Sequence, residues 1–334
     1  MILGMGVNSH AELIQYSGDS TQSSITWSEA EVGQFLSEGT VHETEAPTPP
    51  GTVSVTTTLR AGQAPAASVP TEKVQILDTT KYSNQPSVSA RAALVMDANT
   101  GEVLFSKNAN RALPIASITK LMTAVVISDA KLNMSEKITL QSGDFSCSGC
   151  KSSSSTLRAG DSMNRAEALL FALMKSENPA AAALARTYPG GRAAFIAKMN
   201  AKARELGMTS THFLESTGLH PGNIASARDL GILVNTASQY GLIRQFSTTP
   251  SYDFNLGYRI LKSNNTNALV RNGGWNINIS KTGFINEAGR CVVMHTTLNN
   301  RPVAVVILGA SDSATRTNEA IRLMNWTSHL PKPI

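Results

Sequence analysis

Apolar and polar positions along this 334-residue chain predict strands at both ends of its folded part. Two short apolar segments, 92–97 and 103–105, flank the turn sequence Asn99-Thr100-Gly101 and predict a β-hairpin. Three strand-length segments joined by short turns predict an antiparallel meander near the C-terminus: 277–282, 291–298 and 303–308.

The region between these strands has mainly helical periodicity, with Pro179 at a predicted helix start and Gly207 after a predicted helix end. Segment 135–140 is expected to be extended, and the residues after Tyr240 carry few periodic cues. Helices are predicted over 117–127, 164–174, 179–185, 192–206, 227–240 and 315–330.

Strands at both ends with helices between them indicate one α/β domain over residues 87–334. We expect an antiparallel sheet flanked by helices, with an inserted helical subdomain at about residues 136–254. Residues 1–86 are rich in Ser, Thr, Gly and Pro and show no sustained period, which predicts a flexible tail.

Charge is distributed unevenly along the chain. Residues 1–46 hold seven acidic side chains and no Lys or Arg; since the whole chain has a net charge of +5, the remainder carries +12. A basic body favours an anionic partner such as an acidic wall polymer. Arg-rich runs with interleaved aromatic residues are missing from the sequence, so nucleic acid is not an expected partner.

Membrane and metal signals are also missing from the sequence. No apolar run approaches the roughly 18 residues that span a bilayer, and residues 1–7 lack the positive region of a secretory signal. We therefore expect no stable membrane anchor, and no signal peptide is visible. The six histidines show no metal-ligand spacing, so neither a metal nor a cofactor is expected.

Two of the three cysteines, Cys147 and Cys150, form a C-x-x-C in a Ser/Gly-rich segment. A second ligand pair for zinc and the strand-helix context of a redox site are both missing, which leaves a local disulfide or two free thiols. Cys291 lies in an apolar strand pattern and is expected to be a core residue.

Three short motifs occur in order: Ser117-x-x-Lys120, Ser176-Glu177-Asn178 and Lys281-Thr282-Gly283. A Ser-x-x-Lys is expected about once by chance in a chain of this length, and a second one runs from Ser148 to Lys151. The three motifs together are far more specific than any one of them, because this combination is the signature of penicillin-binding proteins and class A β-lactamases.

The chain from about residue 90 to 330 resembles the low-molecular-mass penicillin-binding proteins. Within these serine D,D-peptidases it is most similar to the D-alanyl-D-alanine endopeptidase type, penicillin-binding protein 7. The resemblance rests on Pro114 to Ala124, Met174 to Ala183, Tyr188 to Gly191, Phe213 to Leu219, Ser226 to Leu230 and Trp275 to Gly289. It implies the fold of β-lactamases and penicillin-binding transpeptidases. It also implies that the protein is located in the periplasm or elsewhere outside the cytoplasmic membrane. Cross-linked peptidoglycan peptides would be the substrates, and β-lactam antibiotics would be covalent inhibitors.

The resemblance also implies catalytic roles. Ser117 would attack the carbonyl of a D-alanyl bond and form an acyl-enzyme. Lys120, kept partly neutral by burial and by the nearby cation Lys281, would accept the proton of Ser117. Ser176 would relay that proton to the leaving amine.

Substrate-binding roles follow in the same way. Asn178 would hold the substrate backbone and the Lys120 amine, while Lys281 and Thr282 would fix the substrate by charge and by hydroxyl contact. Gly283 would allow close backbone approach, and the amide of Phe284 would form an oxyanion hole together with that of Ser117.

Several alternatives stay open at this point. Glu177 between Ser and Asn is as in the endopeptidase type, and we expect no C-terminal β-rich domain or amphipathic anchor of the carboxypeptidase relatives. A D-alanyl-D-alanine carboxypeptidase is the alternative, followed by a class A β-lactamase and a non-catalytic penicillin-binding sensor. For a β-lactamase, Glu215 would be the candidate deacylating acid, but a surface acid fits its position as well.

Overall fold

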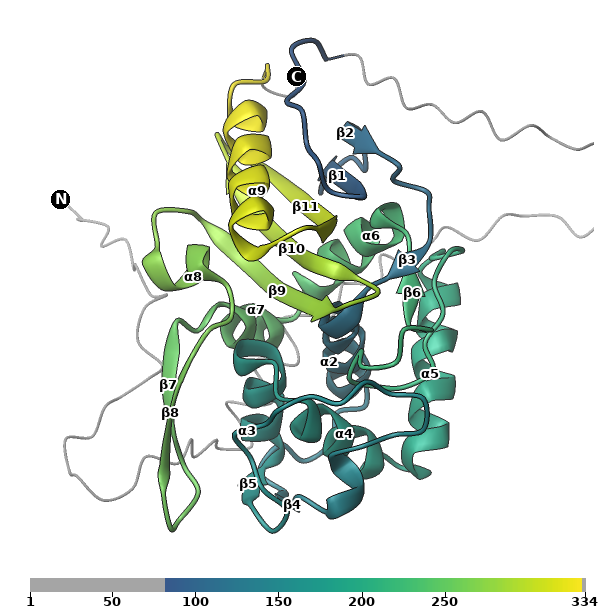
Figure 1. Ribbon diagram of the computed structural model, residues 1–334, viewed down its shortest axis with the longest axis vertical. Coiled ribbons are helices and arrows are strands. Elements are labelled where there is room, and N and C mark those ends of the chain that lie inside the picture. The colour runs from purple at the N-terminus through teal and green to yellow at the C-terminus, as the bar shows by residue number, and fades with distance from the viewer. Residues whose placement is uncertain (1–81, 332–334) are drawn as a thin grey trace, which may run out of the picture.

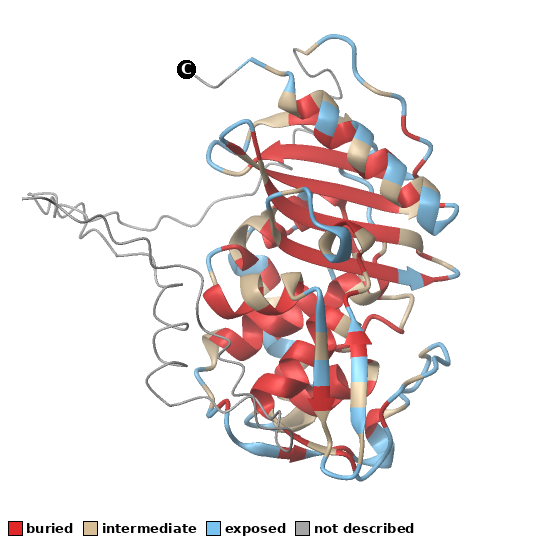
Figure 2. Ribbon diagram, turned by 90° about the vertical axis from the view of Figure 1, so that its left-hand side faces the viewer, coloured by how far each residue is buried: buried red, intermediate tan, exposed pale blue. Residues whose placement is uncertain are grey.

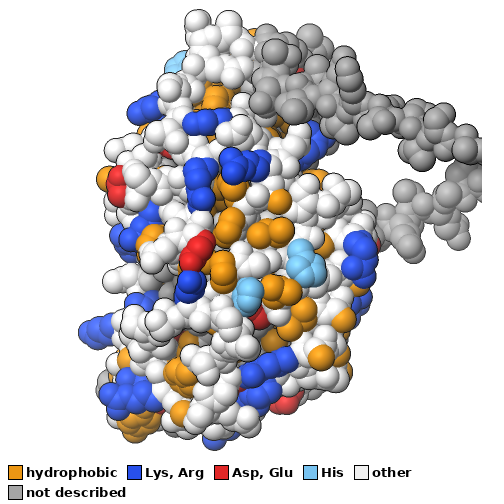
Figure 3. All heavy atoms as spheres, turned by 45° about the vertical axis from the view of Figure 1, so that its right-hand side comes forward, with side chains coloured by type: hydrophobic (Ala, Val, Ile, Leu, Met, Phe, Trp, Pro, Cys, Tyr) orange, Lys and Arg blue, Asp and Glu red, His pale blue; other side chains and the backbone are white. Residues whose placement is uncertain are grey.

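The computed structural model describes residues 82–331 (Figure 1). The predictions for the acidic head and for the start of the chain lie outside these residues, as does nearly all of the predicted tail at 1–86. Within residues 82–331, 25 Lys and Arg face 15 Asp and Glu. Basic side chains are accordingly spread over the face shown in Figure 3, with few acidic ones between them.

A five-stranded antiparallel sheet with the order β2-β1-β11-β10-β9 forms one end of the molecule. Both the predicted hairpin and the predicted meander are confirmed, and β11 joins them by pairing Leu94 with Val306. The strand order places β9 at an edge. The strands are β1 (Ala92–Asp97), β2 (Val103–Lys107), β9 (Ile277–Ile285), β10 (Gly289–Leu298) and β11 (Arg301–Ala310).

Helices cover both faces of this sheet (Figures 1 and 2). The C-terminal helix α9 (Ser313–Ser328) packs Leu323 and Met324 onto one face. On the other face lie α6 (Ala227–Ala237) and α7 (Gly241–Thr248). The central strands are buried along their length because each face has apolar partners.

A helical lobe extends from the second face of the sheet. At its centre is α2 (Thr119–Asp129), in which every residue from Thr119 to Ser128 is buried. The lobe consists of α3 (Arg165–Leu170), the π-helical turn η3 (Phe171–Lys175), α4 (Asn178–Arg186) and α5 (Gly191–Glu205) in addition to α2. A helix that is buried on every side must be enclosed by other elements, and α5, α4 and η3 pack against α2.

Two short antiparallel strand pairs join these parts: β3 (Leu113–Pro114) with β6 (Ile224–Ala225), and β4 (Lys137–Thr139) with β5 (Ser162–Asn164). The first brings the segment before Ser117 next to the segment before α6. The second fixes the base of the loop that contains Cys147 and Cys150.

The segment after Tyr240 is more regular than its sequence indicates. It forms α7, a hairpin of β7 (Ser251–Asn255) with β8 (Ile260–Asn264), and α8 (Ala268–Asn272). In the hairpin only Phe254 and Ser263 are buried, so hydrophobic alternation is weak there. Among residues 82–331, no helix is long and apolar enough to cross a membrane.

Candidate active site

The nucleophile candidate Ser117 lies in a short 3-10 turn, η1 (Ala116–Ile118), directly before α2. Ala116 has φ +49°, a left-handed conformation that is costly for a residue other than glycine and is often found at functional sites. The turn places Ser117 on the same side of the chain as Lys120. Ser117 is partly exposed, whereas Lys120 is fully buried at the start of α2.

Lys120 lies at the centre of a hydrogen-bond network. Its Nζ is 2.8 Å from Ser117 Oγ, 2.7 Å from Asn178 Oδ1 and 2.7 Å from the carbonyl oxygen of Thr217. The amide and carbonyl oxygens can only accept. A neutral amine would therefore give its two N–H groups to them and turn its lone pair toward the hydroxyl of Ser117. That is the geometry of a general base beside a nucleophile.

The Ser-Glu-Asn motif lies where the π-helical turn η3 meets α4. Ser176 has φ +65°, and π-helical turns are frequent at functional sites. Asn178 is the first residue of α4, so this helix begins one residue before the start predicted at Pro179. Its Nδ2 donates to Ser153 Oγ at 2.8 Å, which orients its Oδ1 toward Lys120.

The third motif is part of the edge strand β9. Lys281 is buried, and its Nζ donates to Ser176 Oγ at 2.8 Å and to the carbonyl of Thr282 at 3.1 Å. Thr282 Oγ1 is 2.7 Å from Thr266 Oγ1. Lys281, which is 105 positions from Ser176 in the sequence, thus contacts the Ser176 hydroxyl in the folded chain.

Gly283 is the point where β9 passes the nucleophile. A Cβ at this position would lie 3.0 Å from both the amide nitrogen of Ser117 and the carbonyl oxygen of Ile115, so a larger residue would require the turn before Ser117 to shift by a few tenths of an ångström. The next residue, Phe284, is 44% exposed, and the guanidinium carbon of Arg290 lies 3.7 Å from its ring centroid. The structure therefore brings all three motifs together around Ser117.

Burial changes the pKa values of both lysines. It lowers the pKa of Lys120 to about 7, although the carboxylates of Glu215 and Glu177 act in the opposite direction. It also lowers the pKa of Lys281 well below its ordinary value, helped by repulsion from Lys120 and Arg316. Burial is therefore the main cause of the lowered pKa of Lys120, as expected. Lys281, the second cause expected, is not among the groups that shift the pKa of Lys120; the repulsion between the two lysines instead lowers the pKa of Lys281.

Sequence reasoning did not find several groups that complete the site. Thr217 contributes a backbone carbonyl, which any residue has, and Ser153 lies in a Ser-rich stretch without a distinguishing pattern. Glu177 accepts hydrogen bonds from Ser155 and Thr156, which attaches that stretch to the Ser-Glu-Asn motif. Among these three residues, only Glu177 could be singled out from the sequence, by its unusual place between the Ser and the Asn of the motif.

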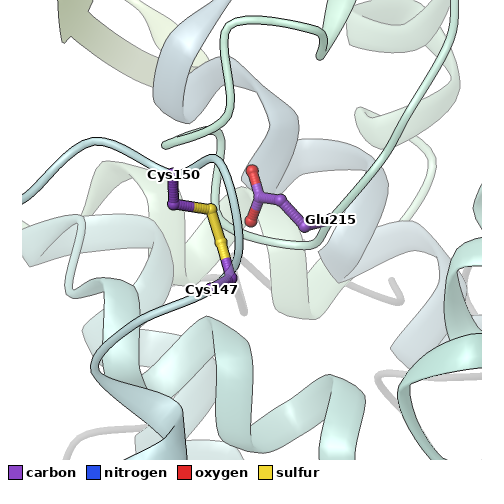
Figure 4. Close-up of side chains that lie close together, drawn as sticks. All are labelled: Cys147, Cys150 and Glu215. Atoms are coloured by element: carbon purple, nitrogen blue, oxygen red, sulfur yellow. A yellow bond between two sulfur atoms is a disulfide. The ribbon is translucent and has the colours of Figure 1, made fainter.

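Cys147, Cys150 and Glu215 form a cluster beside this site, with ligand atoms within 4.8 Å of one another (Figure 4). The two cysteines form a disulfide, so their sulfur atoms are not available as thiolate ligands. The structure thus selects the disulfide from the two cysteine states left open. Cys291 is buried and free, as expected.

Residues 79–312 match the family model of the D-alanyl-D-alanine carboxypeptidases, peptidase S11. A relative from Pseudomonas aeruginosa named D-alanyl-D-alanine endopeptidase is 43% identical over 82% of this chain and 84% of its own length. The Escherichia coli protein of that name is 45% identical over 73% of this chain and 79% of its own. The D-alanyl-D-alanine carboxypeptidase DacF of Bacillus subtilis is 31% identical over 74% of this chain and 64% of its own.

The fold has solved counterparts as well. The crystal structure of the Streptomyces K15 DD-transpeptidase aligns with a TM-score of 0.67 at 29% identity, covering 74% of this chain and 99% of that one. This similarity confirms the predicted penicillin-binding fold. The match to the family model covers well over half of the sequence. The chain therefore belongs to the D-alanyl-D-alanine carboxypeptidase family, peptidase S11.

Proposed function

We propose that this protein is a serine D,D-peptidase that cleaves D-alanyl-D-alanine-type cross-links of peptidoglycan through an acyl-enzyme on Ser117. The observation that carries the proposal is the buried amine of Lys120, 2.8 Å from Ser117 Oγ, with acceptors for both of its remaining N–H groups. With a pKa of about 7, this amine is partly unprotonated at neutral pH and can act as a base.

Acylation moves one proton and exchanges one bond. Lys120 Nζ takes the proton of Ser117 while Oγ forms a bond to the D-alanyl carbonyl carbon. The carbon–nitrogen bond then breaks, and the leaving amine receives a proton by way of Ser176, which is hydrogen-bonded to Lys281. A water molecule completes the cycle by hydrolysing the ester on Ser117.

Substrate binding is proposed along the free edge of β9. Ser280 donates its amide to Ser247 Oγ on α7, which points that amide away from β10. Because backbone groups alternate along a strand, the amides of Thr282 and Phe284 point outward as well. The amides of Phe284 and Ser117 would then both donate to the carbonyl oxygen of the scissile bond of the substrate. Removing one such donor raises the activation free energy by about 3 to 4 kcal/mol.

Thr282 and Gly283 have complementary parts in this arrangement. The hydroxyl of Thr282 lies at the edge beside Lys281, where both can hold a carboxylate or carbonyl of the substrate. Gly283 leaves the backbone open, so an extended peptide can add to the strand. Asn178 lies across from this edge and holds the peptide backbone.

The endopeptidase assignment is supported by two relatives of that name and by Glu177, while the family model is named for carboxypeptidases. Digestion of purified muropeptides, followed by chromatography, separates the two. We expect cross-linked dimers to be cut into monomers. Intact dimers together with loss of the terminal D-alanine from pentapeptides would identify a carboxypeptidase.

The β-lactamase alternative is disfavoured by the position of Glu215. Its carboxylate accepts hydrogen bonds from the amides of Thr217, Gly218 and His220, so it is engaged by its own loop. We expect a long-lived penicilloyl adduct, and rapid nitrocefin turnover would contradict this. A location outside the cytoplasmic membrane is proposed from the wall substrate, and the Cys147–Cys150 disulfide fits an oxidising compartment.

Labelling with a fluorescent penicillin tests the nucleophile. Wild type should be labelled, Ser117→Ala should lose the label, and Ser148→Ala, which removes the serine of the other Ser-x-x-Lys, should keep it. Cleavage of muropeptides by Ser117→Ala at the wild-type rate would refute the acyl-enzyme mechanism on Ser117. Labelling of wild type without cleavage of any muropeptide would instead identify a non-catalytic penicillin-binding sensor.

A further inference from the structure

Glu215 has a set of hydrogen bonds that the proposed chemistry does not explain. Its carboxylate accepts from the amide of Thr217, from the amide of Gly218 at 2.6 Å and from that of His220 at 3.3 Å. Asn223 Nδ2 donates to it at 3.0 Å. Four donors around one partly buried carboxylate fold residues 215–220 into a fixed loop.

This loop is in direct contact with the nucleophile and its base. The carbonyl of Thr217 accepts from Lys120 Nζ at 2.7 Å. Gly218 lies so close to the turn before Ser117 that a Cβ there would be 1.9 Å from the carbonyl oxygen of Ala116. Asn223 also reaches Thr119 Oγ1, at 3.1 Å. Displacement of the Glu215 loop would therefore move an acceptor of Lys120 and the support of Ser117 together.

Glu215 also lies in a protected place. The disulfide between Cys147 and Cys150 lies beside its carboxylate (Figure 4). The next loop residue, Lys151, donates its amide to the carbonyl of Leu219 at 3.0 Å, which joins the disulfide loop to the Glu215 loop. Limited access of water strengthens the interaction of this carboxylate with nearby charges.

Three charged groups act around Lys120. Glu215 is on its own loop, Glu177 is in the turn between η3 and α4, and Lys281 is on β9. Glu177 is attached to Ser155 and Thr156, and Lys281 to Ser176. Glu215 differs from Glu177 in that its bonds hold the loop whose Thr217 carbonyl accepts from Lys120, whereas the bonds of Glu177 go to the Ser155–Thr156 stretch.

We propose that Glu215 is a positioning residue for Lys120: it holds the Thr217 carbonyl as an acceptor of the lysine amine, and its negative charge favours the protonated amine. The proposal rests on the proposed role of Lys120 as the base that activates Ser117. Both effects act through Lys120, and Glu215 itself touches no reacting atom.

Two variants separate charge from position. Glu215→Gln keeps an acceptor oxygen and removes the charge, whereas Glu215→Asp keeps the charge and shortens the reach to the loop amides. Asp229→Asn is the matched control, because Asp229 is a buried carboxylate that also holds a loop, through the amide of Ser210 and the hydroxyl of Thr211. It is not among the charges that act on Lys120.

The measurement is the rate of fluorescent-penicillin acylation of the full chain from pH 5 to 9, with thermal unfolding recorded for each variant. The rate should rise with pH as Lys120 loses its proton. Glu215→Gln should move this rise to lower pH by roughly half a unit or more, since a nearby negative charge is lost. Its plateau rate should fall at least threefold, because the loop is less firmly held.

Glu215→Asp should keep the wild-type midpoint with a reduced plateau, and Asp229→Asn should match wild type in both. A folded Glu215→Gln with the wild-type midpoint would overturn the proposal. If Glu215→Gln does not fold, a wild-type plateau in Glu215→Asp would overturn it instead. Absence of any labelling in wild type would contradict the proposed function, which distinguishes the two failures.

Discussion

Replacing Lys120 by Met should make the stability of this protein less dependent on pH. An unfolded lysine keeps its proton up to a pKa of 10.5, whereas burial lowers that of the folded Lys120 to about 7. Between these values the unfolded chain binds more protons, so stability rises with pH. Integrating from pH 6.5 to pH 9 gives wild type a gain of about 2.5 kcal/mol from this one group.

Lys120→Met lacks this gain. The variant also leaves Asn178 Oδ1 and the Thr217 carbonyl without their donor, but that cost is the same at both pH values and cancels in the difference. Loss of Lys120 also relieves the repulsion that lowers the pKa of Lys281. This change reduces the pH dependence of the variant further, so it acts in the same direction.

Urea unfolding at pH 6.5 and pH 9.0, with the disulfide intact, measures the effect. The free energy of unfolding of wild type should increase by about 2.5 kcal/mol more than that of Lys120→Met. Lys137→Met, at an exposed position on β4, serves as the control and should follow wild type. Equal increases in wild type and Lys120→Met would refute the claim that the folded protein holds a partly neutral lysine.

Two further predictions concern the loops beside Ser117. Gly218→Ala should lose acylation and about 3 kcal/mol or more of stability, because Gly218 has φ +88° and its Cβ would overlap the carbonyl of Ala116. Gly207→Ala is the control: Gly207 has φ +72° but open space around it, so the variant should lose only about 1 kcal/mol in the same urea titration. Replacing both Cys147 and Cys150 by Ser should lower the free energy of unfolding by about 2 kcal/mol, because the disulfide no longer restricts the entropy of a four-residue loop in the unfolded chain. An unchanged urea midpoint would contradict this.

The sheet could be predicted from the sequence because its strands are buried on regular faces. The meander from 277 to 310 has strong alternation or continuous apolar runs bounded by turn residues, and each strand was found within a few residues. The region after Tyr240 could not be predicted in this way. Its hairpin buries one side chain per strand, and its order depends on tertiary contacts such as the stacking of Phe254 on Phe171.

The site was predictable to the extent that its chemistry depends on side chains. Ser117, Lys120 and Lys281 have motif spacings, and the structure brings them together. The backbone part was not predictable. Left-handed conformations at Ala116 and Ser176, and the carbonyl of Thr217, arise from packing between segments that are distant in sequence. Glu215 could be seen as an acid, but its four donors become visible only in the folded loop.

The position of β9 at the edge of the sheet also affects association between molecules. An open edge strand offers unpaired backbone groups to any extended chain, including a strand of another copy. Here Ser280 is already bonded to Ser247, and the turn containing Ser117 packs against Gly283, so only a short part of the edge is free. A peptide of a few residues can add to such an edge, whereas a full strand from a second molecule cannot align along it. The same restriction that would select short peptides thus works against edge-to-edge aggregation at β9.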